Sequence, residues 1–274
     1  MNYFQALILG IIQGITEFLP ISSSGHLVIV PYLLRWNIPS EQIFPFNVLI
    51  QLGTLVSVII YFWKDLVEII KNFVSGIFES HPFTNEKTRL GWMIIIATIP
   101  ALIGGLFFKD IVESAFESVL AVAIFLIVTA ILLFIADKVG KNLYSMKDIN
   151  WKTALFIGIF QLFALFPGLS RSGSTISGGV IRGLIRKEAA RFSFLMSIPV
   201  MFGAGILSIK DLLAVPDLNH FLPVLLIGFI TSGIVGYFSI HWLLNFLNKK
   251  SFIGFSIYCV LLAIIIFITL LIKN

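Results

Sequence analysis

Six apolar stretches constrain the fold of this chain more than any other feature. They cover residues 44–63, 90–108, 118–136, 190–209, 221–244 and 252–272. A helix of roughly 20 residues crosses a hydrocarbon core of about 30 Å, whereas a membrane β-barrel would show alternating polar and apolar residues. Of all residues, 58% are hydrophobic and only 12% are charged, too few charges for a water-soluble surface. The sequence therefore predicts an all-α, polytopic integral membrane protein with one membrane domain over 1–274.

Three further features exclude other classes of protein. The first apolar segment has no basic region before it and is interrupted by Gln13 and Glu17, so we do not expect a cleaved signal peptide. Cys259 is the single cysteine, which excludes a disulfide framework or a cysteine metal site. The net charge of +5 comes from basic residues in loops, as expected beside membrane lipids, and predicts no nucleic-acid partner.

A polar break rich in Ser and Gly occurs twice inside apolar sequence. Each residue of the second copy lies 148 positions after its counterpart, as Gln161 does after Gln13. The first break is the expected loop Ser22–Gly25, between a helix over 3–19 and a short helix over 26–34. The second is the expected loop Ser170–Ser174, between a helix over 153–166 and a short helix that ends near residue 185. These pieces are too short for comfortable spans, so each half (1–140 and 151–274) is predicted to contain one broken hairpin and three spans.

The basic residues predict how the hairpins lie in the membrane. If each hairpin is re-entrant, 14 Lys and Arg residues share one face and 4 the other, with Arg171 inside the membrane. If each crossed once, the split would be 10 against 8, while two crossings per hairpin would match the re-entrant count. Because Lys and Arg favour cytoplasmic loops, we expect both termini outside. We also expect the site to open outward, although tips that enter from both faces could open to either. The second half would then be an inverted repeat of the first, with the two tips meeting near the midplane.

The first break carries groups suited to catalysis. Gln13 and Glu17 are four residues apart and share a helix face. A carboxylate inside a membrane is either functional or paired, and the structural alternative is an ion pair with Arg171. Ser23 is a candidate nucleophile, activated by Glu17 or His26, while His26 could itself be the nucleophile, a phosphate ligand or the leaving-group acid.

The second break carries the groups suited to an anion. The guanidinium of Arg171 matches a pair of phosphate oxygens. Each break precedes a helix whose positive N-terminal end would face the same place. The candidate phosphate-binding residues on these grounds are Ser22, Ser24, Gly25, Ser170, Ser172 and Gly173. A single Ser/Gly run is more often a simple helix cap, but two runs at membrane depth favour a shared site.

If the bound anion were a diphosphate, its negative charge would exceed what Arg171 could neutralise. A divalent cation held by Glu17, with the amide oxygen of Gln13 as a further ligand, would restore the balance. Around this centre, the sequence offers a polar stripe of Asn47, Gln51 and Thr54 with Ser193 and Ser197 as its counterpart, either lining the site or joining helices. The histidines His81, His220 and His241 are expected in loops or interfaces.

Two motifs together resemble a known family. Gln13-x-x-x-Glu17 with Ser22-Ser23-Ser24-Gly25-His26, and Pro167-Gly168-Leu169-Ser170-Arg171-Ser172-Gly173-Ser174-Thr175, resemble the bacterial undecaprenyl-pyrophosphate phosphatase family over essentially the whole chain. The resemblance implies a bacterial inner-membrane enzyme that hydrolyses undecaprenyl pyrophosphate to undecaprenyl phosphate, recycles this lipid carrier for peptidoglycan and confers bacitracin resistance. It also implies Mg²⁺ or Ca²⁺ dependence, catalytic Glu17, Ser23, His26 and Arg171, and Thr175 near the phosphates. Family members carry Glu or Gln at position 13, so Glu17 would bear the charge alone here.

Two other classes of protein share parts of this pattern. The type-2 phosphatidate phosphatases require a His and an Asp where this chain has Ser177 and Ile181, which excludes them. A transporter or flippase for a polyprenyl phosphate lipid is the main rival, because inverted repeats with broken helices are typical of transporters. The sequence does not fix the oligomeric state and allows a homodimer.

Overall fold

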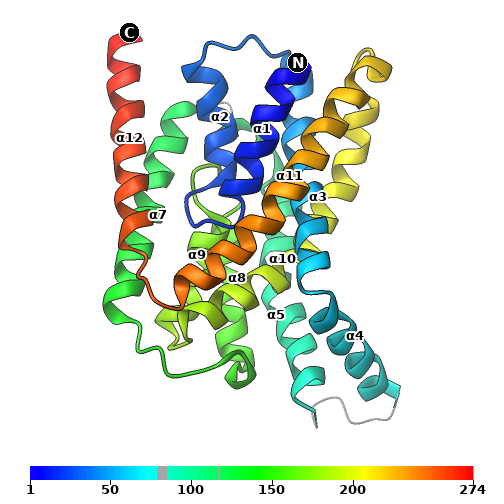
Figure 1. Ribbon diagram of the computed structural model, residues 1–274, viewed down its shortest axis with the longest axis vertical. Helices are drawn as coiled ribbons and strands as arrows, with labels where there is room; N and C mark the ends of the chain where they lie inside the picture. The colour runs from blue at the N-terminus through cyan, green and yellow to red at the C-terminus, as the bar shows by residue number, and fades with distance from the viewer. Residues whose placement is uncertain (79–84, 117, 274) are drawn as a thin grey trace.

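The protein is a bundle of helices packed around a long axis (Figure 1). The computed structural model describes residues 1–78, 85–116 and 118–273. In these ranges the helices are α1 (Tyr3–Thr16), α2 (Ser23–Leu33), α3 (Ser40–Tyr61), α4 (Trp63–Phe78), α5 (Glu86–Phe107), α6 (Lys109–Phe116), α7 (Val119–Val139), a 3₁₀ turn (Met146–Asp148), α8 (Trp151–Phe163), α9 (Arg171–Ile181), α10 (Arg186–Leu213), α11 (Leu218–Leu247) and α12 (Ile253–Lys273). The described residues form no β-strand beyond one isolated bridge between Tyr144 and Leu184.

Among the described helices, α3, α5, α7, α10, α11 and α12 are long and apolar enough to cross a membrane. They coincide, within a few residues at most ends, with the six predicted spans. The prediction of an all-α polytopic membrane protein is therefore confirmed. Both termini lie at the same end of the bundle, and the connections α7–α8 and α11–α12 lie at the other (Figure 1).

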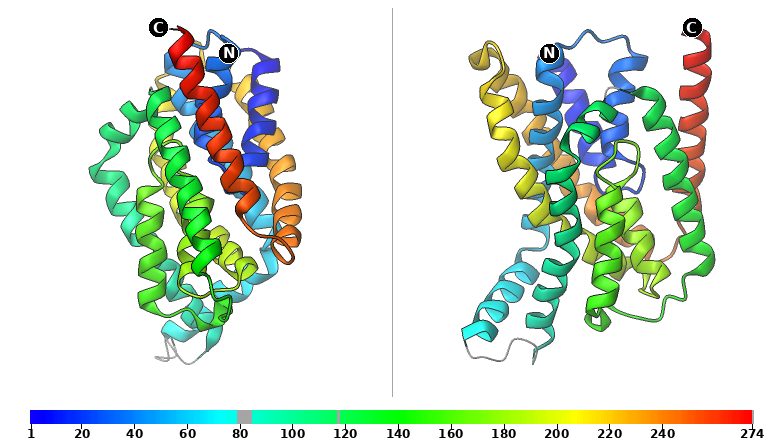
Figure 2. Two further views of the ribbon diagram at one scale, coloured as in Figure 1. Left: turned by 90° about the vertical axis from the view of Figure 1, so that its left-hand side faces the viewer. Right: turned by 180° about the vertical axis from the view of Figure 1, so that it is seen from behind.

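The two broken hairpins consist of α1 with α2 and of α8 with α9. They come from opposite ends of the bundle, and their tips lie side by side in its middle (Figures 1 and 2). Their local structure repeats at the 148-residue offset. Asn2 and Asn150 cap α1 and α8 with the same backbone angles, φ −107° and ψ 170°. The inverted relation of the complete halves stays a prediction, which these opposed hairpins support.

Small residues let the first helix of each hairpin pack closely against a long helix. A Cβ at Gly10 of α1 would lie 2.8 Å from the carbonyl oxygen of Gly228 in α11. A Cβ at the equivalent Gly158 of α8 would lie 2.5 Å from the carbonyl oxygen of Ala97 in α5. Both helices therefore depend on glycine for their position, as is common between membrane helices.

Two expectations about local structure are wrong. Ser22–Gly25 and Ser170–Ser174 are largely helical rather than loops, because α2 begins at Ser23 and α9 at Arg171. The cause is the cap: the hydroxyls of Ser22 and Ser170 accept hydrogen bonds from the N–H groups of Gly25 and Gly173. In addition, α4 and α6 form between predicted spans. Helix α4 packs on α5. Its apolar residues form a narrow face and no long apolar run, so the helix does not resemble a span.

The histidines other than His26 lie at the periphery of the molecule where the structure describes them. His220 is exposed and contacts Asp217 at 3.2 Å, and His241 lies between Tyr61 and Asn245 at the surface. His81 lies outside the described residues.

Candidate active site

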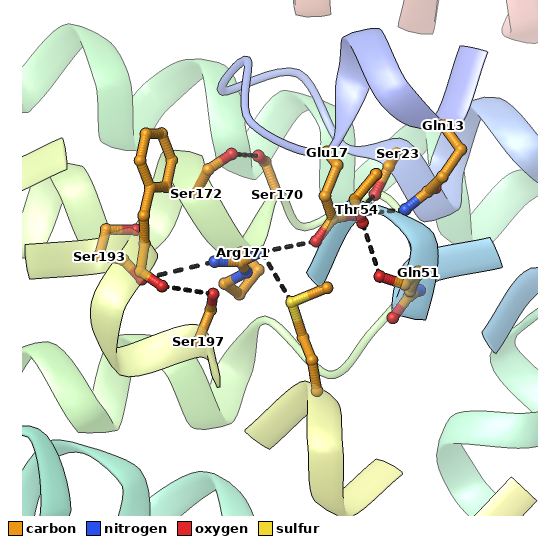
Figure 3. Close-up of polar contacts among 12 residues, drawn as sticks. Gln13, Glu17, Ser23, Gln51, Thr54, Ser170, Arg171, Ser172, Ser193 and Ser197 are labelled. Atoms are coloured by element: carbon orange, nitrogen blue, oxygen red, sulfur yellow. Dashed lines mark hydrogen bonds and ion pairs between the residues drawn. The ribbon is translucent and has the colours of Figure 1, made fainter. Parts of the chain in front are cut away.

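The tips of the two hairpins are joined by direct hydrogen bonds. The backbone N–H of Gly168 donates to Ser22 Oγ at 3.1 Å, and Ser172 Oγ donates to the carbonyl oxygen of Leu19 at 3.0 Å. A Cβ on Gly25 would lie only 3.3 Å from Gly168 Cα. The expectation that the two breaks meet is confirmed, and the polar groups of both face one another (Figure 3).

Two left-handed residues allow this approach. Gly168 has φ +94°, which glycine adopts without steric cost. Ser22 has φ +69°, a conformation that costs a non-glycine residue on the order of 1–2 kcal/mol. Such strain persists only where the surroundings over-determine it, and it is commonly found at functional sites.

Glu17 is the central acceptor of the site. It is the residue that follows α1, and its side chain is only 6% exposed. One oxygen, Oε1, pairs with Arg171 at 2.5 Å. The other, Oε2, accepts hydrogen bonds from Ser23 Oγ at 2.6 Å and from Gln13 Nε2 at 2.8 Å. The ion pair weighed as a structural alternative does form, but the same carboxylate also holds a serine hydroxyl, which an ion pair alone does not require.

Arg171 is the first residue of α9, and some N–H groups of its guanidinium make only weak contacts. Its side chain is 15% exposed. Beyond Glu17, its contacts to the carbonyl oxygen of Ser193 at 3.5 Å and to the sulfur of Met201 at 3.6 Å are long (Figure 3). A guanidinium has five N–H groups, so an anion could replace these weak contacts without breaking the pair with Glu17.

The starts of α2 and α9 add backbone donors. The first N–H groups of a helix have no partner within it, so Ser23, Ser24, Arg171 and Ser172 present theirs at the hairpin tips. The helix dipoles place partial positive charge there. The tips of both hairpins therefore offer the donors that an anion site needs.

The remaining predicted phosphate-binding residues mostly serve the scaffold in this structure. Within each tip the two serine hydroxyls lie close together, at 3.3 Å for Ser22 and Ser24 and 3.2 Å for Ser170 and Ser172. Gly173 donates its N–H to the cap of α9. Thr175 is fully buried; its hydroxyl donates to the carbonyl oxygen of Arg171 at 2.7 Å and lies 2.6 Å from Ser193 Oγ. Their part in binding phosphate stays a prediction.

His26 is oriented by two neighbours. Its Nδ1 lies 2.7 Å from the carbonyl oxygen of Ser22, which can only accept, so Nδ1 carries the proton. In the neutral ring, Nε2 then accepts from the hydroxyl of Tyr258 at 2.7 Å. The hydrogen bond of Ser23 goes to Glu17. Of the two bases considered for Ser23, the structure brings Glu17 into contact.

The donors near Glu17 suit a hard divalent cation. The Oε1 atom of Gln13 is buried and has no hydrogen-bond partner among the described residues. With the Glu17 carboxylate and Ser23 Oγ it forms an all-oxygen set, which Mg²⁺ and Ca²⁺ prefer. No group of three His, Cys, Asp or Glu residues that could hold a metal exists in the described ranges, so phosphate oxygens and water would complete the shell.

The polar stripe of α3 lies beside this cluster. Figure 3 places Gln51 and Thr54 next to Gln13 and Glu17. The Thr54 hydroxyl donates to the carbonyl oxygen of Gln51 at 2.7 Å. Two residues of the stripe are thus drawn at the cluster, and a role of the stripe in lining the site stays a prediction.

Comparison with known proteins assigns the chain to a family. The family model described as "Bacitracin resistance protein BacA" matches residues 6–265. The chain belongs to the BacA family. A curated protein of Chloroherpeton thalassium named undecaprenyl-diphosphatase is 42% identical over 96% of this chain and 95% of its own. Proteins of the same name from Methanosphaera stadtmanae and Caldicellulosiruptor bescii are each 43% identical over 97% of both chains.

Three residues of this BacA-family site carry no signal in the sequence. Tyr258 lies in the apolar helix α12, yet its hydroxyl meets His26. Thr129 of α7 accepts from the N–H of Ser170 and donates to the carbonyl oxygen of Gly168, both at 3.0 Å. Met201 of α10 lies against Arg171. Only the three-dimensional packing of distant helices brings them to the motifs.

Proposed function

We propose that this protein hydrolyses undecaprenyl diphosphate to undecaprenyl phosphate and inorganic phosphate, which recycles the lipid carrier for peptidoglycan synthesis and confers bacitracin resistance. The observation that carries the proposal is the 2.6 Å hydrogen bond from Ser23 Oγ to Glu17 Oε2 beside the Arg171 guanidinium. The proposed nucleophile and the proposed anion-binding group thereby both contact the proposed base, and the curated relatives bear the name of this activity.

The terminal phosphate binds between the hairpin tips. Arg171 and the first N–H groups of α2 and α9 bind its oxygens, so negative charge that develops during the reaction meets donors already in place. The site excludes bulk water because Glu17, Ser22 and Ser170 are nearly fully buried. In such surroundings, charge–charge interactions are stronger than in water.

Glu17 accepts the proton of the Ser23 hydroxyl as Ser23 Oγ attacks the terminal phosphorus. The bond from that phosphorus to the bridging oxygen breaks, and undecaprenyl phosphate leaves. Water then hydrolyses the phosphoserine and releases inorganic phosphate. Direct attack by water, or by His26 as nucleophile, stays the alternative to Ser23.

Glu17 and Gln13 would hold a divalent cation, Mg²⁺ or Ca²⁺. Bound there, the ion would neutralise phosphate charge. We place the protein in the bacterial inner membrane with its termini outside and the site open outward. The positions of the basic connections α7–α8 and α11–α12, opposite the termini, support this orientation.

Phosphate release from undecaprenyl diphosphate by detergent-purified protein tests the proposal. We expect metal-dependent release by the wild type, and losses of about 10³-fold or more in Glu17→Gln and Ser23→Ala. Ser114→Ala, at an exposed serine of α6, serves as the matched control and retains full activity. A protein that binds the lipid without releasing phosphate would refute the enzyme and favour the transporter.

A further inference from the structure

A cavity is lined by residues of α1, α2 and α3, the helices that also lead to the candidate active site. It has a volume of about 700 Å³ and is at the end of the bundle where both termini lie. Most of its lining is apolar and includes Leu9, Leu27, Val28, Pro31 and Ile43, with Asn47 as a polar member. This volume and this mixture of many apolar groups with few polar ones are typical of small-molecule sites.

Three helices lead from this cavity to the catalytic groups. Leu9 precedes Gln13 by four residues on α1, and Leu27 follows Ser23 by four residues on α2. Four residues are about one turn of a helix, and residues at this spacing share a face. On α3, Asn47 likewise precedes Gln51 by four residues, and Gln51 lies beside Glu17 in Figure 3. The cavity is therefore one helical turn from the candidate site along every helix that they share.

Asn47 is a buried donor in need of an acceptor. Its side chain is 3% exposed, and its Nδ2 has no hydrogen-bond partner among the described residues. A buried amide without a partner destabilises a fold, whereas a bound acceptor would satisfy it. Since Asn47 lines the cavity one turn from Gln51, the missing acceptor would lie between the cavity and the catalytic groups.

We propose that this cavity binds the isoprenoid units next to the diphosphate, and that Asn47 Nδ2 donates to the phosphate that carries the lipid chain; this rests on the proposed function. The apolar lining suits the isoprenoid chain, and the amide suits a phosphate oxygen. The cavity is far too small for the complete lipid tail, so the remainder lies among the membrane lipids. Asn47 thus binds the substrate and sets how deeply the diphosphate enters.

Another apolar groove is a poorer place for the chain. It has a volume of about 440 Å³ and lies between α3 and α11, lined by Val56, Ile60 and Phe229 among others. On α3, Val56 and Ile60 face away from Gln51 and Thr54, because they are roughly half a turn around the helix from them. A chain in this groove would be separated from Glu17 by α3 itself.

Asn47→Leu tests the polar half of the proposal. Replacing an unpartnered buried amide by an apolar side chain of similar size leaves the melting temperature equal or higher, while the loss of a hydrogen bond to phosphate lowers kcat/KM about tenfold to hundredfold. Ser57→Ala is the matched control on α3, at a residue that does not line the cavity. Its hydroxyl donates to the carbonyl oxygen of Gly233 at 2.5 Å, so the substitution lowers the melting temperature and leaves kcat/KM within about twofold. A lower melting temperature with unaltered kinetics in Asn47→Leu would show a structural residue and overturn the assignment.

Ile43→Trp tests the apolar half. The larger ring fills part of the cavity and raises KM for undecaprenyl diphosphate about tenfold or more, because isoprenoid surface can no longer be buried there. Val56→Trp fills the α3–α11 groove instead and leaves KM within about twofold. If Val56→Trp raised KM and Ile43→Trp did not, the isoprenoid chain would be assigned to the α3–α11 groove instead. A wild-type protein that releases no phosphate would refute the proposed function itself, whereas an active wild type with both cavity variants unaltered would refute only this inference.

Discussion

Neutralising one partner of the Glu17–Arg171 pair tests whether the pair also stabilises the fold. Replacing Arg171 by Met retains length and apolar bulk but leaves the Glu17 carboxylate, 6% exposed, without its cation. Breaking a buried pair in this way costs about 3–5 kcal/mol. Glu17 keeps its hydrogen bonds from Ser23 at 2.6 Å and Gln13 at 2.8 Å, which places the expected loss near the lower end, about 3 kcal/mol.

The double variant Glu17→Gln/Arg171→Met separates charge from packing. It buries no charge at this position, so its stability should return to within about 1 kcal/mol of the wild type. The two substitutions would then be coupled by at least about 2 kcal/mol, plus whatever Glu17→Gln alone costs, which a double-mutant cycle measures. Chemical denaturation of all four proteins in one detergent gives the stabilities, and phosphate release gives the activities.

Stability and activity should respond differently in this series. Both single variants and the double variant lose phosphate release, because each lacks a group that contacts substrate or nucleophile. Only the double variant regains stability. The reasoning fails if Arg171→Met is as stable as the wild type, or if the double variant is less stable than Arg171→Met. Either result would mean that the ion pair does not stabilise the fold by neutralising the buried Glu17 carboxylate.

Further predictions concern the surroundings of the site. Tyr258→Phe removes the donor to His26 Nε2 and should lower kcat by less than about tenfold in the phosphate-release assay; a loss as large as that of His26→Ala would give the hydroxyl a part in the chemistry. Gly158→Ala places a Cβ 2.5 Å from the Ala97 carbonyl oxygen and should destabilise the protein by about 1–3 kcal/mol in denaturation experiments, whereas Gly105→Ala, with open space around it, should be neutral or slightly stabilising. EDTA should abolish phosphate release and excess Mg²⁺ or Ca²⁺ restore it; full activity after exhaustive chelation would contradict a metal site at Glu17 and Gln13.

The helices and the partnership of the two breaks could be predicted because their signals are local. Apolar runs of sufficient length define the spans, and the repeat of Gln13 as Gln161 indicates two matching hairpins. From that repeat follows the meeting of the two tips, where the ion pair between Glu17 and Arg171 that the sequence offers as a structural alternative forms. The orientation in the membrane likewise follows from counting basic residues, and it stays a prediction.

What could not be predicted depends on packing between distant helices. Helix α4 mixes charged and apolar residues and lacks a long apolar run, so a search for spans misses it, although its apolar residues recur at helical spacing and form the face that packs on α5. Tyr258 is one aromatic residue in an apolar span, and nothing local distinguishes it from a residue that faces lipid. The start of α2 at Ser23 depends on the Ser22 cap, whose left-handed backbone requires the second hairpin beside it.

Ser22 links the fold of the site to its chemistry. Its hydroxyl accepts from the N–H of Gly25 at 3.2 Å and from the N–H of Gly168 at 3.1 Å, so one side chain begins α2 and binds the second hairpin. Its carbonyl oxygen accepts from Nδ1 of His26, which fixes the tautomer and leaves Nε2 as an acceptor. Together these three hydrogen bonds offset the cost of the left-handed backbone. Because the same residue also directs Ser23 into the first turn of α2, the contact between the two hairpins and the position of the proposed nucleophile beside Glu17 form together.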